Sequence, residues 1–95
     1  MRQFLINGKS MTSKEAIYQQ LNRLFSFPPY FGKNLDALWD VLNQATEPTE
    51  IHFIHVESLL EQMEGYGEKL LNVFRQLEKS NEHYKIHFYP FEMDT

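Results

Sequence analysis

Two aspartates, Asp36 and Asp40, are the residues whose type and spacing most suggest chemistry. With Asn34 as N-cap, the apolar residues of the same segment follow the i, i+3, i+4, i+7 spacing of one buried helical face. Those apolar residues are Leu35, Leu38, Trp39 and Leu42. At about 100° per residue the two carboxylates lie roughly 40° apart on another face. Like charges at this spacing cost a few tenths of a kcal/mol, so helix stability does not explain them.

Paired carboxylates can divide acid and base roles in a hydrolase. That chemistry needs a concave, partly dry pocket, whereas these two side chains project from an exposed helical ridge. The sequence also lacks a Ser-His-Asp order, a phosphate loop and a glycine-rich nucleotide fingerprint. We therefore expect a binding surface without catalytic residues. Asn43 beside the aspartates, the edge of Trp39, and Tyr30 in the preceding turn suit such a surface.

Histidines are the other candidates for chemistry, as metal ligands. His52 and His55 lie three residues apart in a predicted strand, so their side chains project to opposite faces. His52 and His87 could meet on neighbouring strands, but strand histidines are more often satisfied by solvent or backbone. The chain has no cysteine, which removes thiolate ligands. We expect no metal site and no cofactor.

The acidic residues are concentrated in one part of the chain. The net charge is −4, and residues 34–68 contain eight acids but no Lys or Arg. Such a segment suits a basic protein partner and disfavours nucleic acid. For four of the acids a role in solubility is the simpler explanation. These four are Glu57, Glu61, Glu64 and Glu68.

Length and composition indicate one domain over residues 1–95, with a frayed tail from about 90 to 95. The absence of cysteine fits a reducing compartment. No signal-peptide pattern and no apolar run long enough to span a bilayer is present. We expect a cytoplasmic protein that does not bind membranes and is monomeric when free.

Hydrophobic periodicity and turn residues predict the order strand, two helices, strand, two helices, strand. This order indicates an α/β fold, a small three-stranded parallel sheet with right-handed crossovers and about four helices. The expected strands are Arg2–Ile6, Glu50–Val56 and Tyr84–Tyr89.

The first helix is expected to begin with a capping box, Thr12 with Glu15, and to run to Phe25 before Pro28. The second helix follows Asn34. After the central strand we expect a short helix over Ser58–Met63, a flexible joint over residues 65–67, and a last helix ending at Ser80-Asn81.

The segment YFGKNLDALWDVL, from Tyr30 to Leu42, closely resembles the signature of the barstar family of intracellular ribonuclease inhibitors. The resemblance extends more loosely over the whole chain, through Asn7-Gly8, the loop with Pro48, and Val73-Phe74-Arg75. It implies a three-stranded parallel sheet with helices, in agreement with the order predicted above.

The resemblance also implies which residues bind. In this family the second helix and the turn before it plug the ribonuclease active site. Asp40 would take the place of a substrate phosphate and pair with arginine and histidine, and Asp36 would add a second anionic contact. The positions that inherit contact roles are Tyr30, Gly32, Asn34, Leu35, Asp36, Trp39 and Asp40.

The chain departs from the family pattern at the rim of this surface. Phe31 stands where tyrosine is common, the run from Asn43 to Ala45 replaces a stretch with glycine and tryptophan, and Gln76 replaces a glutamate. We include Asn43 and Gln76 among the partner-binding residues. Because rim residues usually set specificity, the cognate enzyme need not be barnase. The alternative is an interaction module or immunity protein with the same fold that binds a different basic partner.

Overall fold

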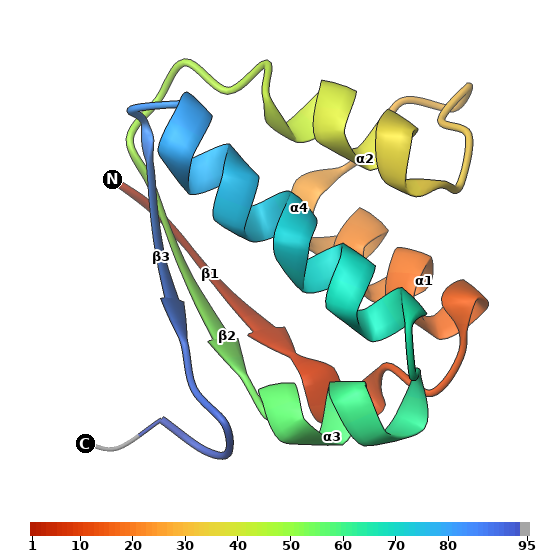
Figure 1. Ribbon diagram of the computed structural model, residues 1–95. Coiled ribbons are helices and arrows are strands. Elements are labelled where there is room, and N and C mark those ends of the chain that lie inside the picture. Colours follow the sequence, from red (N-terminus) through yellow and green to blue (C-terminus); the bar gives the residue numbers. More distant parts are fainter. Residues whose placement is uncertain (94–95) are drawn as a thin grey trace.

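Three parallel strands form one sheet in the order β1-β2-β3 in the computed structural model, which describes residues 1–93 (Figure 1). Strand β2 is central and pairs with both neighbours. The strands are β1 (Arg2–Asn7), β2 (Thr49–Ile54) and β3 (Tyr84–Phe88). The predicted α/β class with a three-stranded parallel sheet is confirmed.

All the helices lie on one face of the sheet (Figure 1). The strands join in sequence order, so two right-handed crossovers pass over the same face. In the described part of the chain, none of the helices is long and apolar enough to cross a membrane. The helices are η1 (Gly8–Ser10), α1 (Lys14–Phe25), α2 (Leu35–Leu42), α3 (Val56–Gln62) and α4 (Tyr66–Ser80).

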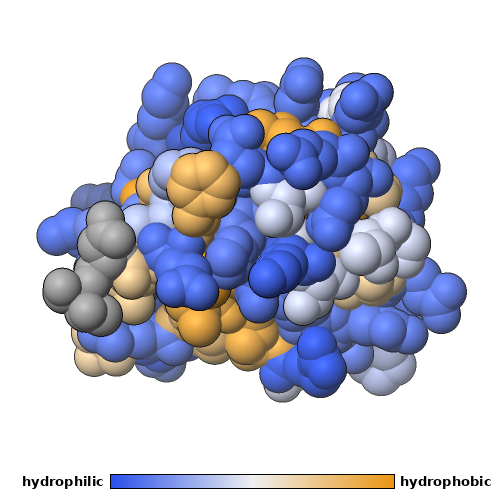
Figure 2. All heavy atoms as spheres, turned by 90° about the horizontal axis from the view of Figure 1, so that it is seen from below, coloured by the Kyte–Doolittle hydropathy of each residue, from blue (hydrophilic) through white to orange (hydrophobic). Residues whose placement is uncertain are grey.

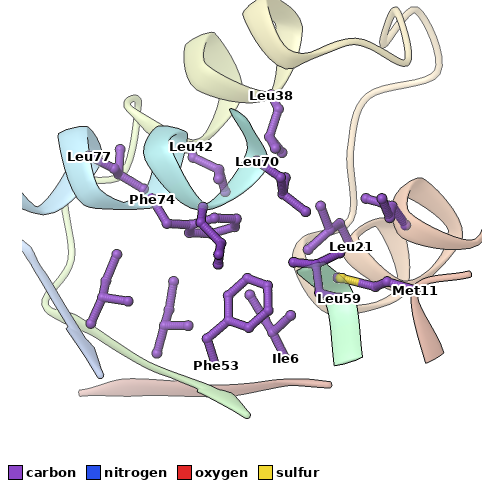
Figure 3. Close-up of a cluster of buried hydrophobic side chains, with 14 of the residues drawn as sticks. Ile6, Met11, Leu21, Leu38, Leu42, Phe53, Leu59, Leu70, Phe74 and Leu77 are labelled. Atoms are coloured by element: carbon purple, nitrogen blue, oxygen red, sulfur yellow. The ribbon is translucent and has the colours of Figure 1, made fainter. Parts of the chain in front are cut away.

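The core lies between the sheet and the helices. Ile51 and Phe53 of β2 are buried on the helical side, while Glu50 and His52 alternate to the open side and stay partly exposed. Phe53 meets Phe74 of α4 edge to face, with ring centroids 5.5 Å apart (Figure 3). A single cluster of buried side chains connects the three strands and helices α1 to α4 with this centre.

The predicted start of the first helix is wrong by one residue. The N-cap is Ser13, whose hydroxyl accepts a hydrogen bond from the backbone N–H of Ala16 at 3.0 Å. Glu15 is therefore only the second residue of α1, and a capping box needs the third. The capping box of Thr12 with Glu15 does not form.

The central strand ends two residues earlier than predicted. His55 adopts a left-handed backbone with φ of 54°, which turns the chain directly into α3 at Val56. The predicted joint over residues 65–67 is also wrong in part. Only Gly65, with φ of 74°, has a turn conformation, whereas Gly67 is buried in the first turn of α4 against Leu59.

The chain after β3 returns to the start of α3. The carbonyls of Tyr89 and Pro90 accept hydrogen bonds from the backbone N–H groups of Val56 and Glu57, each at 3.1 Å. These N–H groups belong to the first turn of α3, which has no side-chain cap. The region expected to be a frayed tail thus begins with residues that cap a helix, and residues 94–95 lie outside those described.

Gly8 provides the first prediction. A Cβ at this position would overlap the carbonyl oxygen of His55 and approach Cβ of Leu59 to 3.1 Å. We expect Gly8→Ala to lower the free energy of unfolding by roughly 1–3 kcal/mol, as overpacking does, in urea denaturation. Lys9→Ala, at the next and exposed position of the same short helix, is the control and should stay within about 0.5 kcal/mol of wild type. Equal stability of the two variants would contradict this packing.

Candidate binding surface

Helix α2 begins where the sequence predicts. The side-chain oxygen of Asn34 accepts a hydrogen bond from the backbone N–H of Ala37 at 2.8 Å, so Asn34 is confirmed as N-cap. Leu38 and Leu42 are buried. Leu35 and Trp39 are partly buried and pack against the same core. The predicted apolar face is therefore turned inward, and the other side of α2 faces solvent.

Asp36 and Asp40 lie on the solvent side of α2, and both are exposed. Within residues 1–93 neither carboxylate forms a hydrogen bond or an ion pair, because the ion pairs of that region join Glu50 to histidines. Asp36 lies in the first turn, near the positive end of the helix dipole, while the last turn has no basic residue. The two negative charges are thus available to a partner.

The turn before α2 holds Tyr30 out into solvent. Phe31 turns inward, stacking on Phe27 with ring centroids 4.2 Å apart and lying 5.9 Å from the Tyr18 ring. A backbone hydrogen bond of 3.0 Å from Phe31 N–H to the Pro28 carbonyl closes the turn. The Tyr30 side chain is 87% exposed. Its exposure agrees with the turn pattern, and its contact role stays a prediction.

Two hollows flank α2 and gather most of the predicted contact residues. One, of about 290 Å³, is lined by Tyr30, Gly32 and Asp40 together with residues such as Gln44. The other, of about 360 Å³, lies between α2 and α4. Its lining includes Leu35, Asp36, Trp39 and Gln76. Helix α2 is therefore a ridge with one aspartate at each hollow.

The C-terminal end of α2 is held by β3 and the turn before it. The Tyr84 hydroxyl donates to the Leu42 carbonyl at 2.5 Å, and burial raises the pKa of Tyr84 to about 12. The Asn81 amide lies 3.3 Å from the Asn43 carbonyl oxygen and 3.4 Å from its side-chain oxygen. Asn43 is therefore tied to the fold while remaining exposed.

Several residues of this surface were not predicted from the sequence. Asn72 and Ser80 line the second hollow on either side of Gln76. These three polar residues recur every four positions along α4, and that spacing could have identified them as one stripe. Tyr84 and Asn81 had no local signal, because their partners lie about forty positions away.

The acidic segment does not form one surface. Asp36 and Asp40 lie on α2, whereas Glu57 and Glu61 lie on α3, at the opposite end of the helical layer (Figure 1). Glu50 is on the open face of the sheet. Seen from the side of α3, the surface is mostly hydrophilic with separate apolar patches (Figure 2). Only the α2 pair accompanies the predicted contact residues.

Comparison with known proteins points to one family. A family model described as Barstar (barnase inhibitor) matches residues 1–91. A protein of Bacillus subtilis (strain 168) named "Putative ribonuclease inhibitor YrdF" is 43% identical to the chain over 42 residues. That match covers 44% of this chain and 46% of the relative, so it spans about half the length of each.

The buried hydroxyl of Tyr84 predicts a pH dependence of stability. Its pKa is about 12 in the folded protein, above the ordinary 10.0, so its contribution is complete below pH 10 and is lost between pH 10 and 12. Tyr84→Phe should cost about 1 kcal/mol at pH 8 through the lost hydrogen bond. The difference between variant and wild type should then shrink above pH 10. Urea unfolding at a series of pH values measures the free energy of unfolding of both proteins. A difference between them that stays constant from pH 8 to pH 12 would contradict a role for the ionisation of Tyr84.

Proposed function

The chain belongs to the barstar family, and we propose from that premise that it inhibits a basic ribonuclease or related nuclease toxin by placing α2 in the active site. The observation that carries the proposal is the pair Asp36 and Asp40, both exposed and unneutralised within residues 1–93. A nuclease cleft that binds RNA phosphates presents arginine, lysine and histidine. Two carboxylates on one ridge supply the charge that such a cleft binds.

Asp40 is the central contact in this proposal. It would occupy the position of a substrate phosphate, and arginine pairs with carboxylates through short, charge-assisted hydrogen bonds. Asp36 would make a second anionic contact about one turn away. The apolar surface of Leu35 and Trp39 borders Asp36, and its burial would exclude water and strengthen the charge pairs.

The rigidity of α2 supports tight binding. The helix is capped by Asn34 at its start and held at its end by Tyr84, which bonds Leu42, and by Asn81, which bonds the C-cap residue Asn43. Stacking of Phe31 on Phe27 anchors the preceding turn. Little conformational entropy would therefore be lost at the interface, and preorganisation of this kind raises affinity.

Specificity is proposed to lie in the rim of the two hollows. Gln44 lines the hollow that holds Asp40, and Gln76 lines the hollow that holds Asp36. Both side chains are neutral amides, and both would contact a partner beside α2 and not at the central aspartates. Differences there change which nuclease fits while the central aspartates stay the same.

The biological role proposed is protection of the producing cell, as an immunity protein or antitoxin acting in the cytoplasm. The protein would have no catalytic activity of its own, no cofactor, and no direct contact with nucleic acid. It would be monomeric until it meets the nuclease.

Replacing Asp40 tests the proposal directly. We expect Asp40→Ala to weaken inhibition of the responsive ribonuclease by roughly tenfold or more, since hydrogen bonds to charged groups contribute about 1.5–3 kcal/mol. The measurement is RNA cleavage against inhibitor concentration, with barnase and other basic nucleases as candidates. Glu61→Ala, on α3 and away from α2, is the matched control and should change inhibition less than about twofold.

Unchanged RNA cleavage across barnase-like and toxin nucleases would count against inhibition. In that case, capture of a different basic protein by wild type but not by Asp40→Ala would favour the interaction module.

Ionic strength provides a second test. Electrostatic attraction between exposed charges speeds association, and salt screens it. The Debye length, over which such charges interact, is about 10 Å at 0.1 M salt and about 3 Å at 1 M. The association rate with the nuclease, measured by stopped flow, should therefore decrease as salt rises. Asp36→Asn should reduce the steepness of that decrease, and Glu61→Gln should leave it nearly as in wild type. An association rate indifferent to salt would exclude steering.

A further inference from the structure

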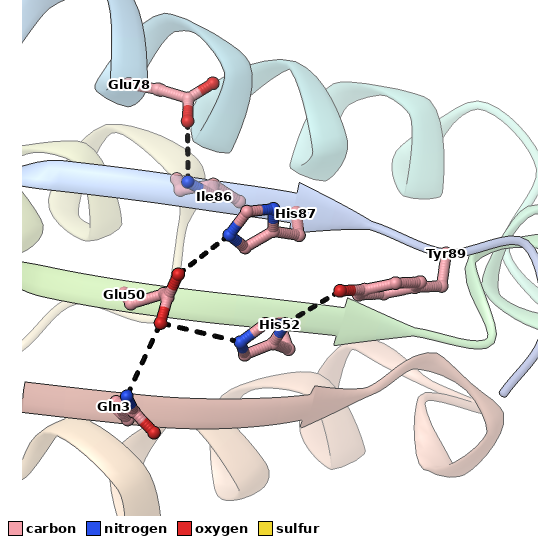
Figure 4. A network of polar contacts seen from close by, with 7 residues as sticks. All are labelled: Gln3, Glu50, His52, Glu78, Ile86, His87 and Tyr89. Atoms are coloured by element: carbon pink, nitrogen blue, oxygen red, sulfur yellow. Dashed lines mark hydrogen bonds and ion pairs between the residues drawn. The ribbon is translucent and has the colours of Figure 1, made fainter. Parts of the chain in front are cut away.

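The open face of the sheet carries two imidazoles and a carboxylate in direct contact (Figure 4). Glu50 and His52 alternate to this face of β2, and His87 lies opposite His52 in the β2–β3 register. The two imidazole rings stack with centroids 4.8 Å apart and planes within 14°. Nε2 of His87 lies 2.8 Å from one Glu50 oxygen, and Nε2 of His52 lies 3.7 Å from the other.

We propose that Glu50, His52 and His87 form a binding site for a divalent transition metal ion, with Zn²⁺ as the ion of best fit. Two imidazole nitrogens and one carboxylate oxygen are a common three-ligand set for zinc, with a fourth position left for water or another ligand. Magnesium and calcium prefer all-oxygen sites, so this donor set disfavours them.

The distances permit coordination after small side-chain rotations. The three donor atoms lie within 4.8 Å of one another. Zinc bonds of about 2.0–2.1 Å in a tetrahedral arrangement would hold donor atoms about 3.3 Å apart. The two imidazole nitrogens now lie 2.8 Å and 3.7 Å from different oxygens of Glu50, so rotation of the carboxylate would be needed to bring one oxygen to both. The side chains of His52, His87 and Glu50 are 23%, 35% and 18% exposed, so an ion could reach them from solvent.

A second layer of contacts orients the donors. The Tyr89 hydroxyl lies 3.0 Å from Nδ1 of His52. If Nδ1–H donates to this hydroxyl, Nε2 carries the free lone pair and points toward Glu50, which is the tautomer that a metal requires. From β1, the Gln3 side-chain amide donates a hydrogen bond to Oε1 of Glu50 at 3.4 Å.

A positive side chain, Lys85, lies near the proposed metal site and should slightly lower its affinity for a cation. Lys85 pairs with Glu50 in the β2–β3 register and is exposed, so its ammonium group competes weakly with a bound cation. From the sequence no metal site is expected here, because strand histidines are more often satisfied by solvent or backbone. The structure places His87 beside His52 through the β2–β3 register, adds the Glu50 carboxylate from the same face of β2, and brings in the Tyr89 hydroxyl from just after β3.

This site is separate from the proposed inhibitory surface. The helices, including α2, cover the other face of the sheet (Figures 1 and 4). Metal binding would join β2 to the edge strand β3 and so stabilise the folded chain, because the unfolded chain does not bring the three ligands together. Nuclease inhibition should not depend on it.

The experiment uses the full chain with Zn²⁺, with Co²⁺ as a spectroscopic probe and Mg²⁺ as a control ion. We expect Zn²⁺ at ten times its Kd to raise Tm by roughly 5 °C or more, and Mg²⁺ to have no such effect. Co²⁺ should give visible ligand-field absorption that Zn²⁺ displaces. In NMR spectra of the histidine rings, Zn²⁺ should shift the signals of His52 and His87, with those of His55 and His83 unchanged.

Variants assign the ligands. His87→Gln should weaken Zn²⁺ binding at least tenfold by calorimetry, and His83→Gln, a histidine just before β3, should bind as wild type. Tyr89→Phe keeps all three ligands and should weaken binding about tenfold through loss of orientation. Equal binding by His87→Gln and His83→Gln, or zinc shifts confined to His55 and His83, would overturn the proposal. Wild-type affinity of Tyr89→Phe would exclude the orienting role of its hydroxyl.

Discussion

Both crossovers of the sheet pass over the same face, because the strands join in sequence order and crossovers in parallel sheets are right-handed. The whole helical layer therefore lies on one side, where Phe53 and Phe74 pack at its centre. Helix α2 occupies the outside of this layer, against α4. Its position allows one side to be buried while the other, with Asp36 and Asp40, is presented to solvent.

The same constraint leaves the second face of the sheet without helices. Of the side chains that alternate outward from β2 and β3, Glu50, His52 and His87 are polar and contact one another, whereas Ile54 at the end of β2 is apolar. Glu50 accepts from His87 and from Gln3, while His52 meets Tyr89. Two surfaces of different chemistry result: a ridge of free carboxylates on the helical side, and a cluster of imidazoles around one carboxylate on the sheet side.

Helix α2 illustrates how binding function depends on support from distant residues. With eight residues it is too short to be stable alone in water. Tyr84 and Asn81 hold its C-terminal end, and buried Leu38 and Leu42 attach it to the core. These contacts offset the repulsion between the two like charges of Asp36 and Asp40. Tertiary contacts, and not the helix by itself, therefore keep the two aspartates in a fixed position on α2.

Local patterns in the sequence determined the α/β order, the N-cap at Asn34, the buried face of α2 and the exposure of Tyr30. Each depends on residues within a few positions of one another, and the YFGKNLDALWDVL segment carries the family resemblance as well. Local patterns did not determine the element ends at Ser13 and His55, because neighbouring residues can cap or turn the chain nearly equally well. Only the tertiary structure decided that Gln76 lies beside Asp36, that Tyr84 holds Leu42, and that His87 lies against His52 and Glu50. Those pairs are thirty-five or more positions apart, and their contact depends on strand register and helix docking, which no local spacing encodes.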